Sequence, residues 1–225
     1  MKIISWNCSG KFRDKFTEIG KYGADIYVIQ ECENPEKTTS LSYKQFAMNY
    51  IWKGDLPYKG LGVFAKPDIS LDRLKWSDHL LRHFIPIKVN NSFTLLAVWA
   101  CNPYIEEYAV YQDIYFDNFD QNMVIIGDFN SNKVFDTKYR LASYRSHSAV
   151  VENLAGKGLY SAYHSITKEN HGEETTSTFY LHRNKDKPHH IDYCFVSSDR
   201  INSFSILQDD WLNYSDHIPL MIDLK

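Results

Sequence analysis

Acids and amides that follow apolar runs are the residues whose types and spacing suit chemistry in this chain. After the β-branched run at residues 124–126, Gly127 is followed by Asp128 and, two residues later, by Asn130. Side chains two apart on an extended backbone point to the same side, so a strand would present the acid and the amide together at its carboxyl end. The same residues also suit a strand-to-loop turn, so this motif alone leaves both interpretations open.

Comparable polar residues end or follow other strand-like runs. They are Asn7, Glu31, Asp192, Asp216 and His217. Burying so many acids in one cleft is unfavourable without a cation. A hard divalent ion offsets that penalty, and magnesium characteristically takes one or two carboxylates together with phosphate and water. If the fold gathers these residues, we therefore expect a site for Mg²⁺ or Mn²⁺.

Length and composition favour one domain that spans residues 1–225. Hydrophobic residues make up 44% of the chain, which is enough for one substantial core. The net charge of −3 and the pI of about 6.3 argue against a strongly basic nucleic-acid binder, although a local basic patch is compatible with them. The apolar runs are too short for a signal peptide or a membrane span. We expect a monomer without a membrane anchor.

The four cysteines are far apart in the sequence, and none forms a CxxC metal or redox pair. Each lies in or beside an apolar run, so we expect buried thiols and a cytoplasmic location.

The periodicity of apolar residues predicts the elements that must position the polar side chains. We expect helices at 12–20, 104–119 and 148–155. Strands are expected at 3–6, 25–31, 60–65, 84–89, 93–100, 124–126, 159–163, 175–180, 191–196 and from 218 onward. Many strands with a few interspersed helices favour two sheets sandwiched between helices.

Two segments are predicted to be basic loops, one after Asn130 and one at 181–190. Their arginines Arg140, Arg145 and Arg183 are candidates for binding substrate phosphates, with a solvated loop as an equal alternative for each residue. His189 and His190 are candidate metal ligands, but we favour a solvated or phosphate-facing pair, because the acids already favour an oxygen-ligated metal.

Five short motifs occur in a fixed order along the chain. They are Ile4-Ser5-Trp6-Asn7, Gln30-Glu31, Gly127-Asp128-Phe129-Asn130, Ile191-Asp192-Tyr193 and Ser215-Asp216-His217. In this order they resemble the endonuclease/exonuclease/phosphatase superfamily, which has the DNase I-like fold. The resemblance covers essentially the whole chain. It implies an α/β (α+β) four-layered sandwich, in which two mostly antiparallel sheets pack face to face and helices cover the outer faces.

The resemblance also implies the metal site. Glu31 resembles the principal ligand of a Mg²⁺ or Mn²⁺ ion, and Asp216 resembles a further acid close to the metal. Asn7 resembles the amide that helps to arrange the metal-bound water and the catalytic acid.

The catalytic roles are implied in the same way. Asp128 resembles the residue that orients or deprotonates the attacking water. Asn130 resembles a donor to a phosphoryl oxygen. His217 resembles the histidine that binds the phosphate, and Asp192 resembles the partner that fixes its imidazole and favours the cationic form.

Two positions depart from the pattern of the superfamily. Ser9 stands where many members carry an acid, which puts a second metal-binding corner in doubt. At 99–103, Cys101 or Asn102 stands where many nucleases have a tyrosine or histidine, so Asn102 is a candidate substrate contact.

These observations predict a divalent-metal-dependent phosphodiesterase that uses in-line attack by water, with a nuclease acting on DNA or RNA as the leading hypothesis. The alternative keeps the mechanism and acts on a small nucleotide, an inositol phosphate or a phospholipid head group. A catalytically silent binding fold is the third hypothesis.

Overall fold

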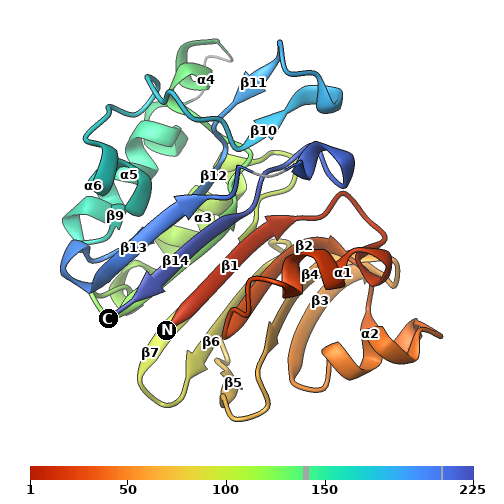
Figure 1. Ribbon diagram of the computed structural model, residues 1–225. Helices are drawn as coiled ribbons and strands as arrows, with labels where there is room; N and C mark the ends of the chain where they lie inside the picture. Colours follow the sequence, from red (N-terminus) through yellow and green to blue (C-terminus); the bar gives the residue numbers. More distant parts are fainter. Residues whose placement is uncertain (139–141, 209) are drawn as a thin grey trace.

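Two six-stranded sheets form the centre of the molecule, in a computed structural model that describes residues 1–138, 142–208 and 210–225 (Figure 1). In spatial order, the first sheet contains β13 (Ile201–Ile206), β14 (Leu220–Leu224), β1 (Lys2–Asn7), β2 (Ile26–Cys32), β4 (Lys59–Ala65) and β3 (Tyr50–Leu56). The second contains β5 (Leu71–Arg73), β6 (Phe84–Val89), β7 (Phe93–Trp99), β8 (Met123–Asp128), β12 (Asp192–Val196) and β9 (Tyr160–Ser161). Of the neighbouring strands described, β1 and β2 are parallel in the first sheet and β7 and β8 in the second. Both sheets are therefore mostly antiparallel, as predicted.

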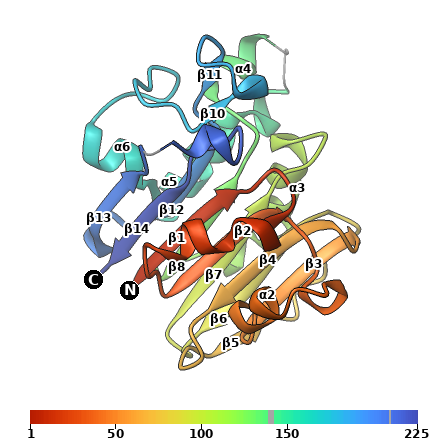
Figure 2. The ribbon, with the colours of Figure 1, turned by 45° about the vertical axis from the view of Figure 1, so that its right-hand side comes forward.

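The remaining elements are short. The helices are α1 (Phe16–Gly20), α2 (Leu41–Phe46), α3 (Ile105–Tyr115), α4 (Lys133–Lys138), α5 (His147–Gly156) and α6 (Ala162–Thr167). Single 3₁₀ turns are η1 (Phe12–Asp14), η2 (Pro35–Lys37), η3 (Phe116–Asn118), η4 (Ser143–Arg145), η5 (Leu181–Arg183), η6 (Ser198–Arg200) and η7 (Trp211–Asn213). A small hairpin of β10 (Phe179–Tyr180) and β11 (Pro188–His189) lies at the end of the sandwich away from the termini (Figures 1 and 2). Across the described part of the chain, the helices are all too short or too polar to cross a bilayer.

Apolar packing between and outside the sheets produces the layers. Between the sheets, Ile3 and Val28 of the first sheet belong to the same buried cluster as Leu95 and Val124 of the second. Ile4 points to the opposite face of β1 and packs in a separate cluster with Tyr43 of α2. Both faces of the central strands are therefore covered, which explains their continuous apolar runs.

The outer face of the second sheet is covered by α3 and α5 (Figure 2). Tyr108 and Tyr111 of α3 and Phe119 beyond it are at most 2% exposed, so the predicted aromatic stripe is core. Val150 and Leu154 of α5 join the same cluster. The predicted helices at 104–119 and 148–155, and the hairpin at 84–100, are confirmed.

Several local predictions were wrong. The segment after Asn130, expected as a loop, contains helix α4, because the Asn132 side chain accepts a hydrogen bond from the Val134 amide and caps its first turn. The expected strand at 159–163 pairs for only two residues before α6 begins. The expected strand at 175–180 is reduced to β10, and the helix at 12–20 is interrupted at Lys15, whose backbone is not helical.

The prediction of buried thiols is confirmed for three of the four cysteines. All four thiols are free; Cys8, Cys32 and Cys194 are buried, and Cys101 is partly exposed.

Candidate active site

Strand ends from both sheets meet at the end of the sandwich opposite the termini (Figure 1). Asn7 ends β1, Glu31 lies near the end of β2, and Asp128 ends β8. The antiparallel register of β8 and β12 places Asp192 directly opposite Asp128. His217 lies three residues before the start of β14, the strand that pairs with β1.

Gly127 allows the close approach of β7 and β8 beside the site. Its φ of +152° lies in a region that L side chains rarely adopt, and an added Cβ would lie 1.9 Å from the Val98 carbonyl oxygen. Only glycine fits this position, so Gly127 is what permits the close approach of the two strands.

Asp128 is fully buried and held by two asparagines. Its Oδ2 accepts hydrogen bonds from Asn7 Nδ2 at 2.9 Å and from Asn130 Nδ2 at 3.0 Å, and its Oδ1 accepts one from the Asn130 amide at 2.8 Å. Asn7 Nδ2 also lies 3.4 Å from Glu31 Oε1. Because Asn7 Oδ1 accepts a hydrogen bond from the Ser9 amide at 3.0 Å, the donor end of the Asn7 amide faces both carboxylates. Asn7 therefore connects the acids of the two sheets.

His217 and Asp192 form a buried pair. His217 Nδ1 lies 3.0 and 3.1 Å from the two carboxylate oxygens of Asp192, and its Nε2 lies 3.9 Å from Asp128 Oδ2. Trp6 Nε1 donates to the His217 carbonyl oxygen, and the Phe179 ring centroid lies 4.6 Å from that of His217. The imidazole is thus fixed by contacts with several elements.

The electrostatics of this group follow from burial and mutual attraction. Burial raises the pKa of Asp128 to about 7, although His217 and Asn7 oppose the shift. Burial disfavours the charged form of His217, but Asp192 and then Asp128 outweigh it and raise the His217 pKa to about 9. At neutral pH, His217 is therefore a cation between two acids, and Asp128 titrates close to neutrality.

The Glu31 carboxylate attracts a cation. Glu31 has a φ of +61° and lies where the register of β2 and β4 shifts, and its Oε2 is 3.0 Å from Lys59 Nζ. Its side chain remains 23% exposed. Asp216 lies one residue beyond Ser215, whose hydroxyl donates to the Asn7 main-chain oxygen at 2.6 Å. The Glu31 carboxylate beside Asn7 fits a hard divalent cation, and Asp216, which is also partly exposed, follows the serine that contacts Asn7.

The sequence model of the Endonuclease/Exonuclease/phosphatase family matches residues 4–217. The chain belongs to this family. The predicted family is therefore confirmed, and the protein is a hydrolase that acts on phosphoester bonds, in a family whose nucleases depend on divalent metal ions. No curated protein matches the chain.

Solved structures of the same fold include three nucleic-acid enzymes. The 3' phosphatase NExo from Neisseria, bound to a product DNA hairpin, is 18% identical with a TM-score of 0.70, and the match covers 100% of this chain and 99% of that one. The 3'-5' exonuclease NExo from Neisseria meningitidis is 17% identical with a TM-score of 0.70 and 100% coverage of both chains. An AP endonuclease from Archaeoglobus fulgidus is 16% identical with a TM-score of 0.74, covering 100% and 99%. These likenesses confirm the DNase I-like fold.

The predicted substrate contacts of this family member lie in different places. Asn102 and Asn130 line a pocket of about 470 Å³. Arg183 donates to the carbonyl oxygens of Asn213 and Tyr214, in the segment just before Asp216. Arg145 lies in η4 with its guanidinium over the Tyr144 ring. Arg140 lies outside the described residues.

One histidine prediction was wrong. His190 is neither solvated nor phosphate-facing; it is 4% exposed, and its Nδ1 lies 2.8 Å from the Thr176 carbonyl oxygen. His189, by contrast, is partly exposed and lines the pocket beside Asn130. The short β11 has no clear signal in the sequence. The sequence therefore does not indicate that His189 and His190 lie in different environments.

Sequence reasoning also missed several supporting residues. Lys59 pairs with Glu31 from the neighbouring strand, and the Thr178 hydroxyl accepts hydrogen bonds from the amides of Ile191 and Asp192. Cys101 Sγ lies 3.4 Å from His83 Nδ1, whereas Asn102 lines the pocket. These are tertiary contacts, and periodicity carries no information about them.

Proposed function

We propose that residues 1–225 act as a single-domain, Mg²⁺- or Mn²⁺-dependent nuclease that hydrolyses phosphodiester bonds of DNA or RNA by in-line attack of water. The observation that carries the proposal is the buried Asp128, which is joined through Asn7 to Glu31 and faces the cationic His217. A base, a metal-binding acid and a fixed positive charge thereby share one site, which is the set that phosphoryl transfer requires.

The metal would be held by Glu31 and Asp216, with Asn7 arranging its surroundings. When bound, such an ion neutralises charge on the phosphate oxygens. Asn7 donates to both Glu31 and Asp128, so it fixes the distance between the metal-binding acid and the base.

Asp128 is the general base in this proposal. Its pKa of about 7 suits proton uptake from water near neutral pH. Asn130 Nδ2, now shared between Asp128 and the Ala100 carbonyl oxygen, is the neutral donor to a phosphoryl oxygen.

His217 supplies the fixed positive charge. Its Nε2 is too far from Asp128 for a hydrogen bond, so the N–H is available to the phosphate. Asp192 accepts from Nδ1 and keeps both ring nitrogens protonated.

The pocket beside Asn130 supports nucleic acid as the substrate. Its walls include the rings of Phe135, Phe179 and His189, and such rings can stack on a base or cover a sugar. The DNA-bound state of the Neisseria 3' phosphatase agrees with this substrate class. A volume of about 470 Å³ also suits a small nucleotide, which is the second candidate substrate. The low pI argues against tight binding to duplex, because phosphate contacts dominate that affinity.

The test is hydrolysis of labelled DNA and RNA, single- and double-stranded, with abasic and 3'-phosphate forms, beside mononucleotide, inositol phosphate and phospholipid substrates. We expect EDTA-sensitive cleavage of nucleic acid that Mg²⁺ or Mn²⁺ restores. If only the small substrates are hydrolysed, the proposal of a nuclease is refuted, and the assignment as a phosphoester hydrolase still holds. No hydrolysis of any substrate would favour a silent binding fold.

We also propose a monomer in the cytoplasm. The four free thiols support a reducing compartment.

A further inference from the structure

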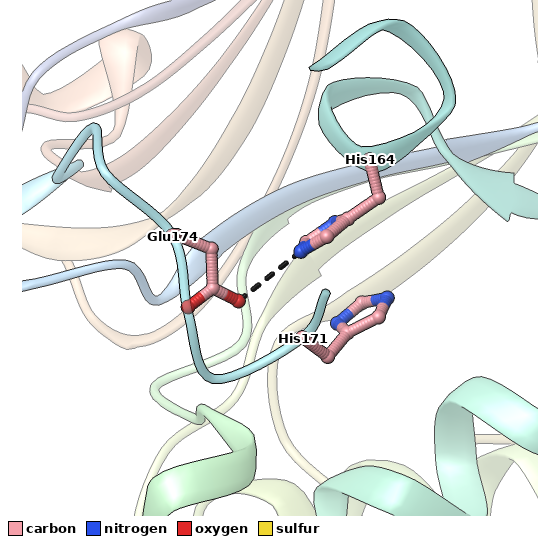
Figure 3. Close-up of side chains that lie close together, drawn as sticks. All are labelled: His164, His171 and Glu174. Atoms are coloured by element: carbon pink, nitrogen blue, oxygen red, sulfur yellow. Dashed lines mark hydrogen bonds and ion pairs between the residues drawn. The ribbon is translucent and has the colours of Figure 1, made fainter. Parts of the chain in front are cut away.

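A second group of titratable side chains lies on α6 and the segment that follows it (Figure 3). His164 Nε2 is 3.2 Å from Glu174 Oε1, and the rings of His164 and His171 stack with centroids 3.6 Å apart. One ligand atom from each of these residues lies within 4.8 Å of the other two. None of the three belongs to the motifs of the active site.

Two more histidines border this group. His147 Nε2 lies 3.2 Å from His171 Nδ1, and the ring of His190 is 6.0 Å from that of His164. His190 is 4% exposed, and its Nε2 has no hydrogen-bond partner among the described residues. We call His147, His164, His171, Glu174 and His190 the histidine cluster. It holds four of the nine histidines of the chain, so imidazole nitrogens, which can ligate a metal, are concentrated there.

In the histidine cluster, His147 and His171 are held in the neutral form and Glu174 in the charged form. Burial lowers the pKa of His147 to about 3 and of His171 to about 4, and the neighbouring histidines add to both shifts. Burial opposes ionisation of Glu174, but hydrogen bonds from His164, Asn132 and the Gly172 amide hold its pKa below the ordinary value. Neutral imidazoles and an ionised carboxylate are the forms that ligate a metal.

A second set of hydrogen bonds orients these groups. His164 Nδ1 lies 2.8 Å from Ser161 Oγ, which leaves Nε2 directed toward Glu174. Asn132 Nδ2 donates to Glu174 Oε2 at 3.0 Å, so Oε1 is the oxygen that faces the histidines. Metal-binding residues commonly have such outer partners, which fix tautomer and direction.

We propose that His164, His171 and Glu174 bind a transition-metal ion, with Zn²⁺ as the preferred ion, at a site separate from the carboxylates of the active site. Two imidazoles and one carboxylate are a recurrent zinc ligand set, whereas magnesium prefers oxygen ligands alone. The two rings are nearly parallel, at 15°, so binding must turn them until their lone pairs converge. The ion would tie α6 and the 168–178 segment to Asn132, two residues beyond Asn130.

The experiment measures metal content and affinity and does not depend on hydrolysis. Purified protein is stripped with a chelator, loaded with Zn²⁺ in millimolar Mg²⁺, desalted and analysed by mass spectrometry, and the affinity is measured by calorimetry. We expect one retained Zn²⁺ per chain in the wild type and in Glu31→Gln. His171→Gln and Glu174→Gln should each weaken binding at least about 100-fold, since loss of outer partners alone weakens metal sites 10- to 100-fold. The exposed His79 provides the matched control, and His79→Gln should bind as the wild type does.

Several results would overturn the proposal. These are no retained Zn²⁺ in the wild type, equal retention in wild type and His171→Gln, or loss of Zn²⁺ in Glu31→Gln alone. If the variants fail to fold, the wild type loaded with Co²⁺ decides: strong visible absorption bands indicate a low-coordinate site with nitrogen ligands. The weak bands of six-coordinate Co²⁺ refute it.

Discussion

The proposed active site and the histidine cluster use the same residue types in opposite proportions. In the active site, one histidine, His217, lies between the two acids Asp128 and Asp192. In the histidine cluster, one acid, Glu174, lies among four histidines. Both groups are largely buried, yet the pKa of His217 is raised to about 9 while that of His171 is lowered to about 4.

The comparison shows that neighbours decide what burial does to a histidine. Burial disfavours the imidazolium in both places, and two carboxylates outweigh it only at His217. The active site therefore keeps a fixed positive charge, which suits a phosphate. In the histidine cluster, His147 and His171 stay neutral, and the lone pairs of neutral imidazoles suit a metal ion.

The largest expected effect is on the base. Asp128→Asn keeps the shape and the hydrogen-bonding geometry near Asn7 but removes the proton acceptor. We expect kcat to fall about 10²- to 10⁴-fold, the usual contribution of a general base. Steady-state hydrolysis of a labelled oligonucleotide measures it, with Asp25→Asn as the control, because Asp25 pairs with Lys66 outside the site. A loss of less than tenfold would remove Asp128 from its proposed role.

The next largest effect is expected from removing the positive charge of His217. His217→Ala should lower kcat about 10²- to 10³-fold, the range for loss of one donor to a developing anion. Asp192→Asn should cost less and should also move the alkaline limit of the pH–rate profile downward, because the His217 pKa loses its main support. An unchanged profile in Asp192→Asn would mean that the pair has only a structural role.

Binding of Zn²⁺ at the histidine cluster should stabilise the folded protein independently of the metal site near Glu31. At a free Zn²⁺ concentration 100 times the Kd, binding stabilises the fold by about 2.7 kcal/mol. For a chain of this length, that corresponds to a rise in Tm of about 5–10 °C. Calorimetric scans of the wild type and His171→Gln, both in excess Mg²⁺, measure the difference. An equal rise in both proteins would place the ion elsewhere.

The contributions of His217 and His171 to stability should depend on pH in opposite ways. The folded-state pKa of His217, about 9, exceeds the ordinary 6.5, so its contribution to stability is fully present below pH 6.5 and is lost as the pH rises toward 9. The folded-state pKa of His171, about 4, lies below 6.5, so its contribution is present above pH 6.5 and is lost as the pH falls toward 4.

Metal-free wild type should consequently lose about 2 kcal/mol more stability between pH 7 and pH 5 than His171→Gln. Urea unfolding at each pH measures this, and ring NMR signals report protonation directly. Neutral His217 at pH 7, or protonated His171 at pH 6, would contradict the comparison.

The two groups also differ in how far the sequence predicts them. Asn7, Glu31, Asp128, Asp192 and His217 each end or follow an apolar run, so strand periodicity and motif order predicted their convergence. The histidine cluster depends on α6, of which the sequence predicted only the first two residues, as the end of a strand, and on a segment without regular structure between His171 and Glu174. The hydrogen bond from Asn132 to Glu174 joins residues 42 apart, and no periodic pattern indicates such a contact.

The smallest effect concerns Lys59, whose ammonium pairs with Glu31 and, in the proposed metal site, competes with the ion for that carboxylate. An ion pair this exposed contributes at most about 1 kcal/mol, so Lys59→Met should lower the Mg²⁺ concentration for half-maximal activity by up to about fivefold. Lys66→Met is the matched control, because Lys66 and Asp25 form an ion pair of similar exposure outside the site. Activity is measured over a Mg²⁺ titration. If the Mg²⁺ requirement is unchanged while KM for the oligonucleotide rises, Lys59 binds substrate phosphate and does not compete with the metal, and the positive charge of the active site then extends beyond His217.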